Sequence, residues 1–389
     1  MNKREPDFVD EYYADKNLSQ LEKLTLIIPT YNRNYYLSRC LWYHAHFPFH
    51  QIIVADSSPE EKKVVNRNTI SKIQAVFGTD ILYLEYNPET EPYGGDIYRK
   101  WGDAVQHVDT EYSQFCTDKE FLIPTSINEC ILYLSENPDY VTAEGVVYQL
   151  KENSNAEYMC TPWQDVPSVD SYAVEERLLT GYERVTGALF SIYRSIHHKQ
   201  IYQNLRTYNV DDIRYGETAI EIEPLFFGKV KKLRDSAGRV RDVSNVTKNN
   251  VLNTSTNTSE SSFLRYPRIY DYPPEQTERL MQNLTDCLHS IYPLDKETIK
   301  QHLIEIIKRR YYPNSGYSVF DKHPLVRNIW GKMPFWIKDF VKERIRWEKE
   351  ISYSTDELGN EIQIIANIIQ NTINCHVDDR TVFAKHNEN

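Results

Sequence analysis

Two acidic residues separated by one lysine follow a short apolar stretch in the first third of the chain. Asp118 and Glu120 come directly after residues 112–117, which read as a strand. Side chains alternate with period two along an extended chain, so both carboxylates are expected on the same side. Such a pair can hold a hard divalent cation that bridges two phosphates. The spacing therefore predicts a site for Mn²⁺ or Mg²⁺ that assists the departure of a diphosphate.

The same pair could instead form a solvated turn, and its surroundings favour the first interpretation. Three of the four strands predicted in this region end in polar clusters, at Thr30 to Arg33, Asp56 to Ser58 and Asp118 to Glu120. In parallel α/β sheets, ligands bind at the carboxyl ends of the strands. We therefore expect a binding site where these three strand ends converge.

The elements that would position these residues alternate between strand and helix. Short apolar runs rich in β-branched residues predict buried strands at 24–28, 51–55, 81–86 and 112–117. Helices with one apolar face are predicted between them, at 33–44, 59–77 and 98–108. This order is typical of a doubly wound, mostly parallel sheet, so we predict a Rossmann-like α/β fold.

The rest of the chain predicts a helical appendage. A helix after Pro124 leads to a strand at 140–150, in which Gly145 indicates a close backbone approach. Residues 151–180 read as loop-rich and 188–201 as a helix, and the pattern is helical beyond 274. We predict a polar N-terminal segment (1–21), a main domain (22–245), an Asn-, Ser- and Thr-rich linker or mobile loop (246–273) and a helical C-terminal extension (274–389).

Composition restricts the classes of function. The 389 residues carry a net charge of -11, which argues against general nucleic-acid binding. No apolar run approaches the roughly 18 residues that a membrane span needs, and the polar N-terminus favours a cytoplasmic location. The six cysteines are scattered without a C-x-x-C pair, so we expect reduced and mostly buried thiols.

Four segments, in chain order, resemble glycosyltransferase family 2. They are Pro29 to Arg33, Asp56 to Ser58, Phe115 to Phe121 and Tyr215 to Glu217. The resemblance covers about residues 22–235 and implies the GT-A fold. It is closest to a bacterial subgroup whose metal motif reads Asp-Asp-Asp-Phe, where this chain has Asp118-Lys119-Glu120-Phe121.

The resemblance implies roles for individual residues. The nucleotide-sugar donor would be bound by Pro29, Thr30, Tyr31, Arg33, Asp56, Ser57, Lys100, Asp118 and Lys119. Asp56 would accept a hydrogen bond from the base, which suits uracil, and Lys100 would face the diphosphate. Asp118 and Glu120 would ligate Mn²⁺ or Mg²⁺. Glu217 would be the general base on the acceptor hydroxyl, with Asp212 as the fallback.

The implied reaction is an inverting transfer of a sugar from a UDP-sugar to a hydroxyl of a surface polysaccharide or glycolipid. Plainer roles stay open, since Asp56 could cap a helix, Lys100 could be a solvated helix residue and Glu217 a surface carboxylate. One alternative function is a degenerate member that binds a nucleotide or glycan as a scaffold, because Lys119 interrupts the acidic motif. The other is a nucleotidyltransferase, although the loop after the first strand lacks the glycines that such an enzyme needs.

A basic and aromatic stretch in the predicted extension has two interpretations. Residues 325–349 contain seven basic and three acidic side chains, with Phe335, Trp336, Phe340 and Trp347 between them. An amphipathic helix of this composition can dock on an anionic membrane surface, where lipid-linked acceptors reside. It could instead pack its aromatic face on the main domain, which is the favoured interpretation.

Overall fold

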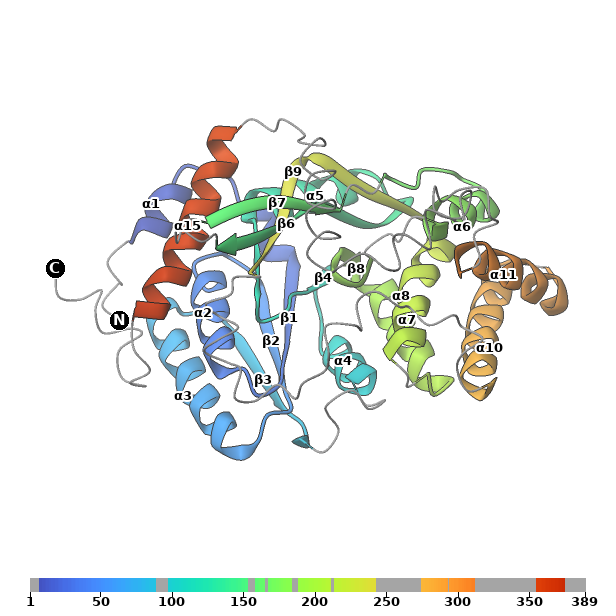
Figure 1. Cartoon of the computed structure of the whole chain (residues 1–389), viewed down its shortest axis with the longest axis horizontal. Coiled ribbons are helices and arrows are strands. Elements are labelled where there is room, and N and C mark those ends of the chain that lie inside the picture. Colours follow the sequence, from blue (N-terminus) through green and yellow to red (C-terminus); the bar gives the residue numbers. More distant parts are fainter. Residues whose placement is uncertain are drawn as a thin grey trace, which may run out of the picture.

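A nine-stranded sheet organises the part of the chain that the structure describes, with the strand order β3-β2-β1-β4-β8-β6-β9-β5 and β7 paired to β6 (Figure 1). The structure is a computed structural model. It describes residues 7–88, 97–152, 158–164, 167–183, 188–210, 213–242, 274–292, 294–311 and 355–374.

The first half of the sheet is parallel, as the sequence predicts. Its strands are β1 (Leu24–Thr30), β2 (Gln51–Asp56), β3 (Ile81–Glu85) and β4 (Tyr112–Phe115). The helices that follow the first three are α2 (Asn34–His44), α3 (Glu60–Phe77) and α4 (Ile97–Gln106). The α/β fold class is confirmed.

Alternate residues of the central strands pack on opposite faces of the sheet. Leu26 and Ile28 join the core beneath α2 and α3, whereas Ile27 joins the core beneath α4 and α7 (Ser195–Thr207). All seven residues of β1 are buried. An unbroken apolar run is what a strand covered on both faces requires, and for this reason β1 could be predicted from composition alone.

The second half of the sheet is mixed and was largely missed by the sequence analysis. Its strands are β5 (Glu120–Leu122), β6 (Tyr140–Glu152), β7 (Tyr158–Gln164), β8 (Ile192–Arg194) and β9 (Lys229–Asp242). Strand β6 pairs with β9 in parallel and with β7 and β8 antiparallel. The stretch predicted as loop-rich therefore contains the strand β7. The helix predicted at 188–201 begins only at Ser195, after the short 3₁₀ turn η3 (Ala188–Phe190) and β8.

Gly145 makes the close backbone approach that the sequence predicts. A Cβ atom on Gly145 would lie 2.6 Å from the backbone nitrogen of Gly238 in β9 and 2.5 Å from Oγ of Ser126 in α5 (Pro124–Glu136). The register of β6 and β9 shifts at this point. Both strands therefore need glycine where they cross.

The predicted C-terminal extension is divided between two sides of the sheet (Figure 1). Helices α10 (Pro274–Ile291) and α11 (Lys296–Tyr311) pack with α6 (Val174–Glu183) and α8 (Ile213–Phe227). Helix α15 (Thr355–Asn374) instead contacts α2, and its Glu361 accepts hydrogen bonds from Tyr13 and Thr125.

The N-terminal segment also contributes to the core. It contains α1 (Phe8–Tyr13) and the 3₁₀ turn η1 (Ser19–Lys23), and Val9 is fully buried. The predicted linker at 246–273 and the basic, aromatic stretch at 325–349 lie outside the described residues. Within the described residues, none of the helices has the length and apolar character that a bilayer span requires. Five cysteines are described, all as free thiols, and four of them are buried.

Candidate active site

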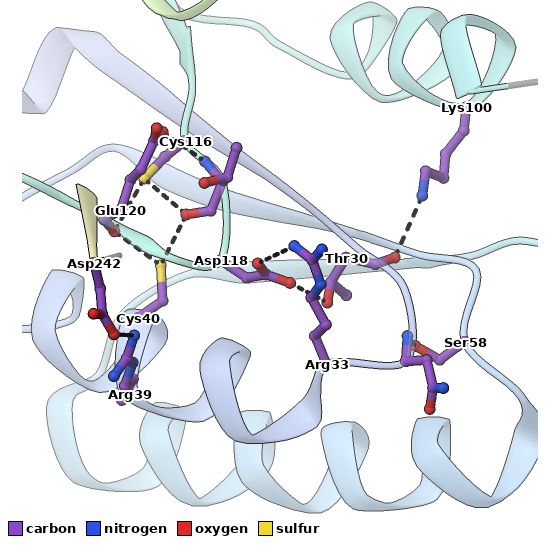
Figure 2. A network of polar contacts seen from close by, with 12 residues as sticks. Thr30, Arg33, Arg39, Cys40, Ser58, Lys100, Cys116, Asp118, Glu120 and Asp242 are labelled. Carbon is purple, nitrogen blue, oxygen red and sulfur yellow. Dashed lines mark hydrogen bonds and ion pairs between the residues drawn. The ribbon is translucent and has the colours of Figure 1, made fainter. Parts of the chain in front are cut away.

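The direction of winding changes between β1 and β4. Strands β2 and β3 lie on one side of β1 and β4 lies on the other, so the carboxyl ends of β1 and β4 form the topological switch point at which ligands bind in such sheets. Thr30 ends β1 and Asp118 lies in the turn after β4. The Thr30 hydroxyl donates to Asp118 Oδ2 at 3.0 Å, directly across this switch point (Figure 2).

Arg33 holds Asp118 from the second side. Its Nη1 lies 3.2 Å from Asp118 Oδ1, and the arginine side chain is 45% exposed whereas Asp118 is 2% exposed. The loop is fixed by Asn32, which has a φ of 54° and whose backbone N–H donates to the Ser58 hydroxyl at 2.8 Å. The guanidinium thus reaches from a buried carboxylate to solvent, where a ligand can meet it.

The neighbouring residues of this loop are placed as follows. Pro29 is buried inside β1, opposite Ala55 in the register with β2. Tyr31 is half-buried beside Thr30. The loop therefore offers its polar groups through Thr30 and Arg33.

Lys100 reaches the same strand ends from α4, on the other face of the sheet. Its ammonium donates to the backbone carbonyl of Thr30 at 3.3 Å (Figure 2). It also donates to the Ser57 hydroxyl at 2.8 Å. Lys100 is 4% exposed, so it is not the solvated helix residue that the sequence left open. A buried ammonium here places positive charge beneath the ends of β1 and β2.

Asp56 at the end of β2 already has three donors from the chain itself. Its carboxylate accepts from the backbone N–H of Ser58 at 2.7 Å, from Asn66 Nδ2 at 2.7 Å and from the Tyr83 hydroxyl at 2.6 Å. The side chain is fully buried. Because an ionised carboxylate has about four acceptor positions, these contacts leave little for a nucleobase. The predicted base contact by Asp56 stays a prediction, which this arrangement does not favour.

Lys119 lies in the turn with Asp118, and its ammonium is 4.5 Å from the centre of the Tyr36 ring. Burial lowers the pKa of Lys119, and the charges of Arg33 and Arg241 lower it further, to about 8, against the opposing charge of Asp118. Loss of hydration is the largest cause of this lowered pKa, since burial disfavours the charged ammonium. Lys119 therefore adds a half-buried basic group beside Asp118.

Glu120 turns away from Asp118 into the core. Its Oε1 accepts from Nη1 of Arg239 at 2.6 Å, and its Oε2 accepts from the backbone N–H of Thr117 at 3.3 Å. Arg239 also pairs with Glu144 at 3.1 Å, and Glu144 in turn accepts from Lys232. All four charged side chains are buried or nearly so. We call Glu120, Glu144, Lys232 and Arg239 the core ion network.

The side chains at the strand ends do not fit the two-carboxylate cation site that the sequence predicts. Glu120 belongs to the core ion network, and both oxygens of Asp118 have partners, Thr30 and Arg33. Among the described residues, three possible ligands within 4.8 Å of one another occur only at Cys40, His44 and Cys116 and at Asp7, Asp10 and His46. Neither group includes Asp118 or Glu120. The divalent cation stays a prediction without support from these contacts.

The predicted general base lies in the first turns of α8. Glu217 is half-buried there, and the preceding Gly216 packs so closely on Tyr98 of α4 that a Cβ would lie 2.1 Å from the ring. Since Tyr98 and Lys100 belong to the same turn of α4, the helix that carries Glu217 adjoins the helix that carries Lys100. The fallback, Asp212, lies outside the described residues.

Sequence reasoning missed the residues of β9 that shape this site. Arg239 neutralises Glu120, and Arg241 adds charge near Lys119. Both belong to the highly charged stretch 229–242, which carries few of the apolar residues that mark a buried strand. The alternation of its basic residues at 239 and 241 was the available signal.

Comparisons with known proteins find distant structural likenesses only. No protein-family model matches the chain, and no curated protein matches it. The chain is similar to S. aureus TarS at 14% identity and a TM-score of 0.43, over 84% of this chain and 47% of that one. It thus spans about half of that structure's length.

Two structures of the TarS fragment 1–349 give similar values. For the fragment alone, identity is 14% and the TM-score 0.44, over 90% of this chain and 82% of the fragment. For its complex with UDP-GlcNAc, identity is 14% and the TM-score 0.46, over 77% of each chain. At these scores the contacts of the site itself must carry any functional argument.

Proposed function

We propose that this chain is a glycosyltransferase that takes a sugar from a nucleoside diphosphate donor, bound at the carboxyl ends of β1, β2 and β4, and transfers it to a hydroxyl. The observation that carries the proposal is the convergence of Thr30, Arg33, Lys100 and Asp118 at the switch point of the sheet. Hydroxyl, guanidinium, ammonium and carboxylate groups are what a ribose and a diphosphate require as partners.

Each group has a distinct part in binding the donor. Asp118, held between Thr30 and Arg33, accepts a hydrogen bond from a ribose hydroxyl and orients the guanidinium. Arg33 and Lys119 face the diphosphate, and Lys100 adds positive charge from beneath. These cations stabilise the negative charge that develops on the leaving nucleoside diphosphate.

Glu217 is proposed as the general base. As the acceptor oxygen attacks the anomeric carbon, its proton passes to the Glu217 carboxylate while the bond between that carbon and the phosphate oxygen breaks. Attack opposite the leaving group inverts the configuration of that carbon. The nucleoside diphosphate leaves with the bonding electron pair.

Several finer points of the proposal come from the sequence alone. Uridine as the nucleoside, a polysaccharide or glycolipid as the acceptor and a GT-A classification follow from the family resemblance. A cytoplasmic location and a peripheral membrane contact through 325–349 are also predictions. The described contacts bear on the donor side of the reaction only.

A second candidate function is nucleotide binding without turnover, and one observation favours it. Glu120, the last acidic residue of the motif, is committed to Arg239 in the core. A scaffold that binds a nucleotide needs no leaving-group assistance, so this arrangement would suit it. Release of UDP from any UDP-sugar by the full chain decides between the two functions.

The test of the proposal combines binding with turnover. UDP and UDP-sugars should raise the melting temperature of the full chain, because they bind only its folded state. Asp118→Asn should reduce that rise at a given nucleotide concentration and slow the release of UDP. Asp80→Asn is the matched control, since this exposed carboxylate lies beside Gln51, at the amino end of β2 and far from the site.

The outcomes separate the alternatives. A melting temperature unaffected by any nucleotide or nucleotide sugar would contradict the proposal. Stabilisation by UDP with no turnover of any sugar donor would select the scaffold function. Equal responses of Asp118→Asn and Asp80→Asn would place the nucleotide elsewhere on the molecule.

A further inference from the structure

We infer that basic side chains of this chain take the place of a divalent cation, so that the site binds a diphosphate without added metal. The inference rests on the proposed function and specifies how the same site neutralises its ligand. The side chains concerned are Arg33, Lys119 and Arg241, which we call the cation cluster. Three features of the residues around Asp118 support binding without metal.

The first feature is that the core ion network needs the Glu120 carboxylate. Its carboxylate is fully buried and paired with Arg239 at 2.6 Å. Withdrawing it toward a metal would leave the buried guanidinium with Glu144 alone and expose an uncompensated charge to a low dielectric. The acidic motif therefore supplies one carboxylate at the ends of β1 and β4, whereas a hard cation prefers several oxygen ligands.

The second feature is that the remaining carboxylate, Asp118, already has a cationic partner. Arg33 Nη1 lies 3.2 Å from Asp118 Oδ1, and the Thr30 hydroxyl occupies Oδ2. A divalent ion at Oδ1 would be brought close to the guanidinium, and like charges at such distances repel strongly outside bulk water. The guanidinium already holds the position of a bound cation.

The third feature is the balance of charge in the turn. Arg33 Nη1 lies 3.2 Å from Asp118, Lys119 lies beside Asp118 in the same turn, and Arg241 of β9 is paired in register with Glu120 at the end of that turn. Asp242, the other acid of this region, is paired with the buried Arg39 at 2.5 Å. An excess of basic side chains around one carboxylate attracts a multiply charged anion. A diphosphate, with its closely spaced oxygens, has the matching chemistry.

The experiment measures the affinity of the full chain for inorganic pyrophosphate and for UDP by titration calorimetry in EDTA, and for UDP again with Mg²⁺ or Mn²⁺. We expect the dissociation constant for UDP to change by no more than about twofold between EDTA and metal. Lys119→Met should weaken both ligands by about tenfold, because a charge-assisted contact is lost while the apolar stem still covers Tyr36. Lys119→Arg should restore the affinity.

Controls separate this inference from the proposed function. Lys72→Met removes an exposed lysine from α3 and should leave both affinities unchanged. Binding of uridine, which has no phosphate, should be insensitive to Lys119→Met. UDP binding that appears only with metal overturns the inference and leaves the proposed function standing. Pyrophosphate binding in EDTA without UDP binding supports the cation cluster and contradicts the nucleotide donor, whereas failure of both ligands overturns both proposals.

Discussion

Charged residues are arranged in opposite ways in the two halves of the sheet. At the carboxyl ends of β1 and β4, Asp118 meets Arg33, whose side chain is 45% exposed, so the pair is open to solvent on one side. In β5, β6 and β9, the core ion network is closed, and Arg239 and Glu120 are 4% and 0% exposed. Two carboxylates that are two residues apart in sequence thus belong to different environments.

The exposure of an ion pair determines whether its charged groups are available to bind a ligand. A partly exposed ion pair contributes little to stability, so its members can exchange one partner for a ligand at low cost. A buried network is hard to open, because removing one member leaves the others uncompensated. On this basis we propose Asp118 and Arg33 as the residues that bind the ligand, and we assign Glu120 to the core ion network.

The largest expected effect comes from opening the core ion network. Arg239→Met leaves Glu120 and Glu144 buried without their shared cation, so the free energy of unfolding should fall by about 3–5 kcal/mol in urea denaturation. Arg67→Met is the matched control, because Arg67 also bridges two glutamates, Glu60 and Glu85, but on the exposed surface of α3. Similar losses of unfolding free energy in the two variants would show that the buried ion network contributes no more to stability than the exposed ion pairs of Arg67.

The second-largest expected effect concerns Glu217, the proposed general base. Glu217→Gln should lower turnover by about a hundredfold, because the acceptor hydroxyl loses its proton acceptor. Donor affinity should be unchanged, since Glu217 does not belong to the diphosphate site. Steady-state rates and calorimetric affinities for the same donor check both parts. Near-normal turnover would move the role to Asp212 or to another residue.

A smaller, pH-dependent effect is expected from a third way to bury a carboxylate. Among the described residues, Glu223 of α8 has no cationic partner and accepts instead from Asn204 at 2.7 Å and Asn283 at 2.9 Å. Burial raises the pKa of Glu223 from 4.5 to about 8, against the effect of these hydrogen bonds. Between these values the folded chain keeps a proton that the unfolded chain has lost, so stability falls as pH rises from about 4.5 to 8.

The measurement is the melting temperature of wild type and Glu223→Gln across that pH range. The glutamine has no proton to lose, so the difference in melting temperature between the two proteins should shift in favour of the variant as pH rises. Parallel curves would show that Glu223 is ionised in the folded chain.

The sequence predicted the parallel half of the sheet because β1 and β2 are marked by apolar runs that lie in the core, and β3 by an apolar run that is half-buried against it. It missed β9 because the charges of that strand, such as Arg239 and Lys232, are satisfied by glutamates from distant strands rather than by water. Such pairings join residues about a hundred positions apart and leave no local pattern.

The convergence of the strand ends could be predicted from the sequence, but the direction of each side chain could not. The strand ends do converge, since Thr30 contacts Asp118 and Lys100. The alternation argument for Asp118 and Glu120 failed because the chain is not extended there. Residues 118 and 119 form a turn, in which the backbone N–H of Glu120 donates to the Thr117 carbonyl at 3.0 Å. This turn sends the two carboxylates in different directions.

The central claim is that the nucleotide meets Asp118 and not Glu120, and the affinity of two variants for UDP tests it most directly. Asp118→Asn should raise the dissociation constant by about tenfold, because a charged acceptor for the ribose is lost and Arg33 loses its anchor. Glu120→Gln should lower the melting temperature and leave the dissociation constant of the folded protein within about twofold. Weakened binding in Glu120→Gln together with unchanged binding in Asp118→Asn would contradict the account.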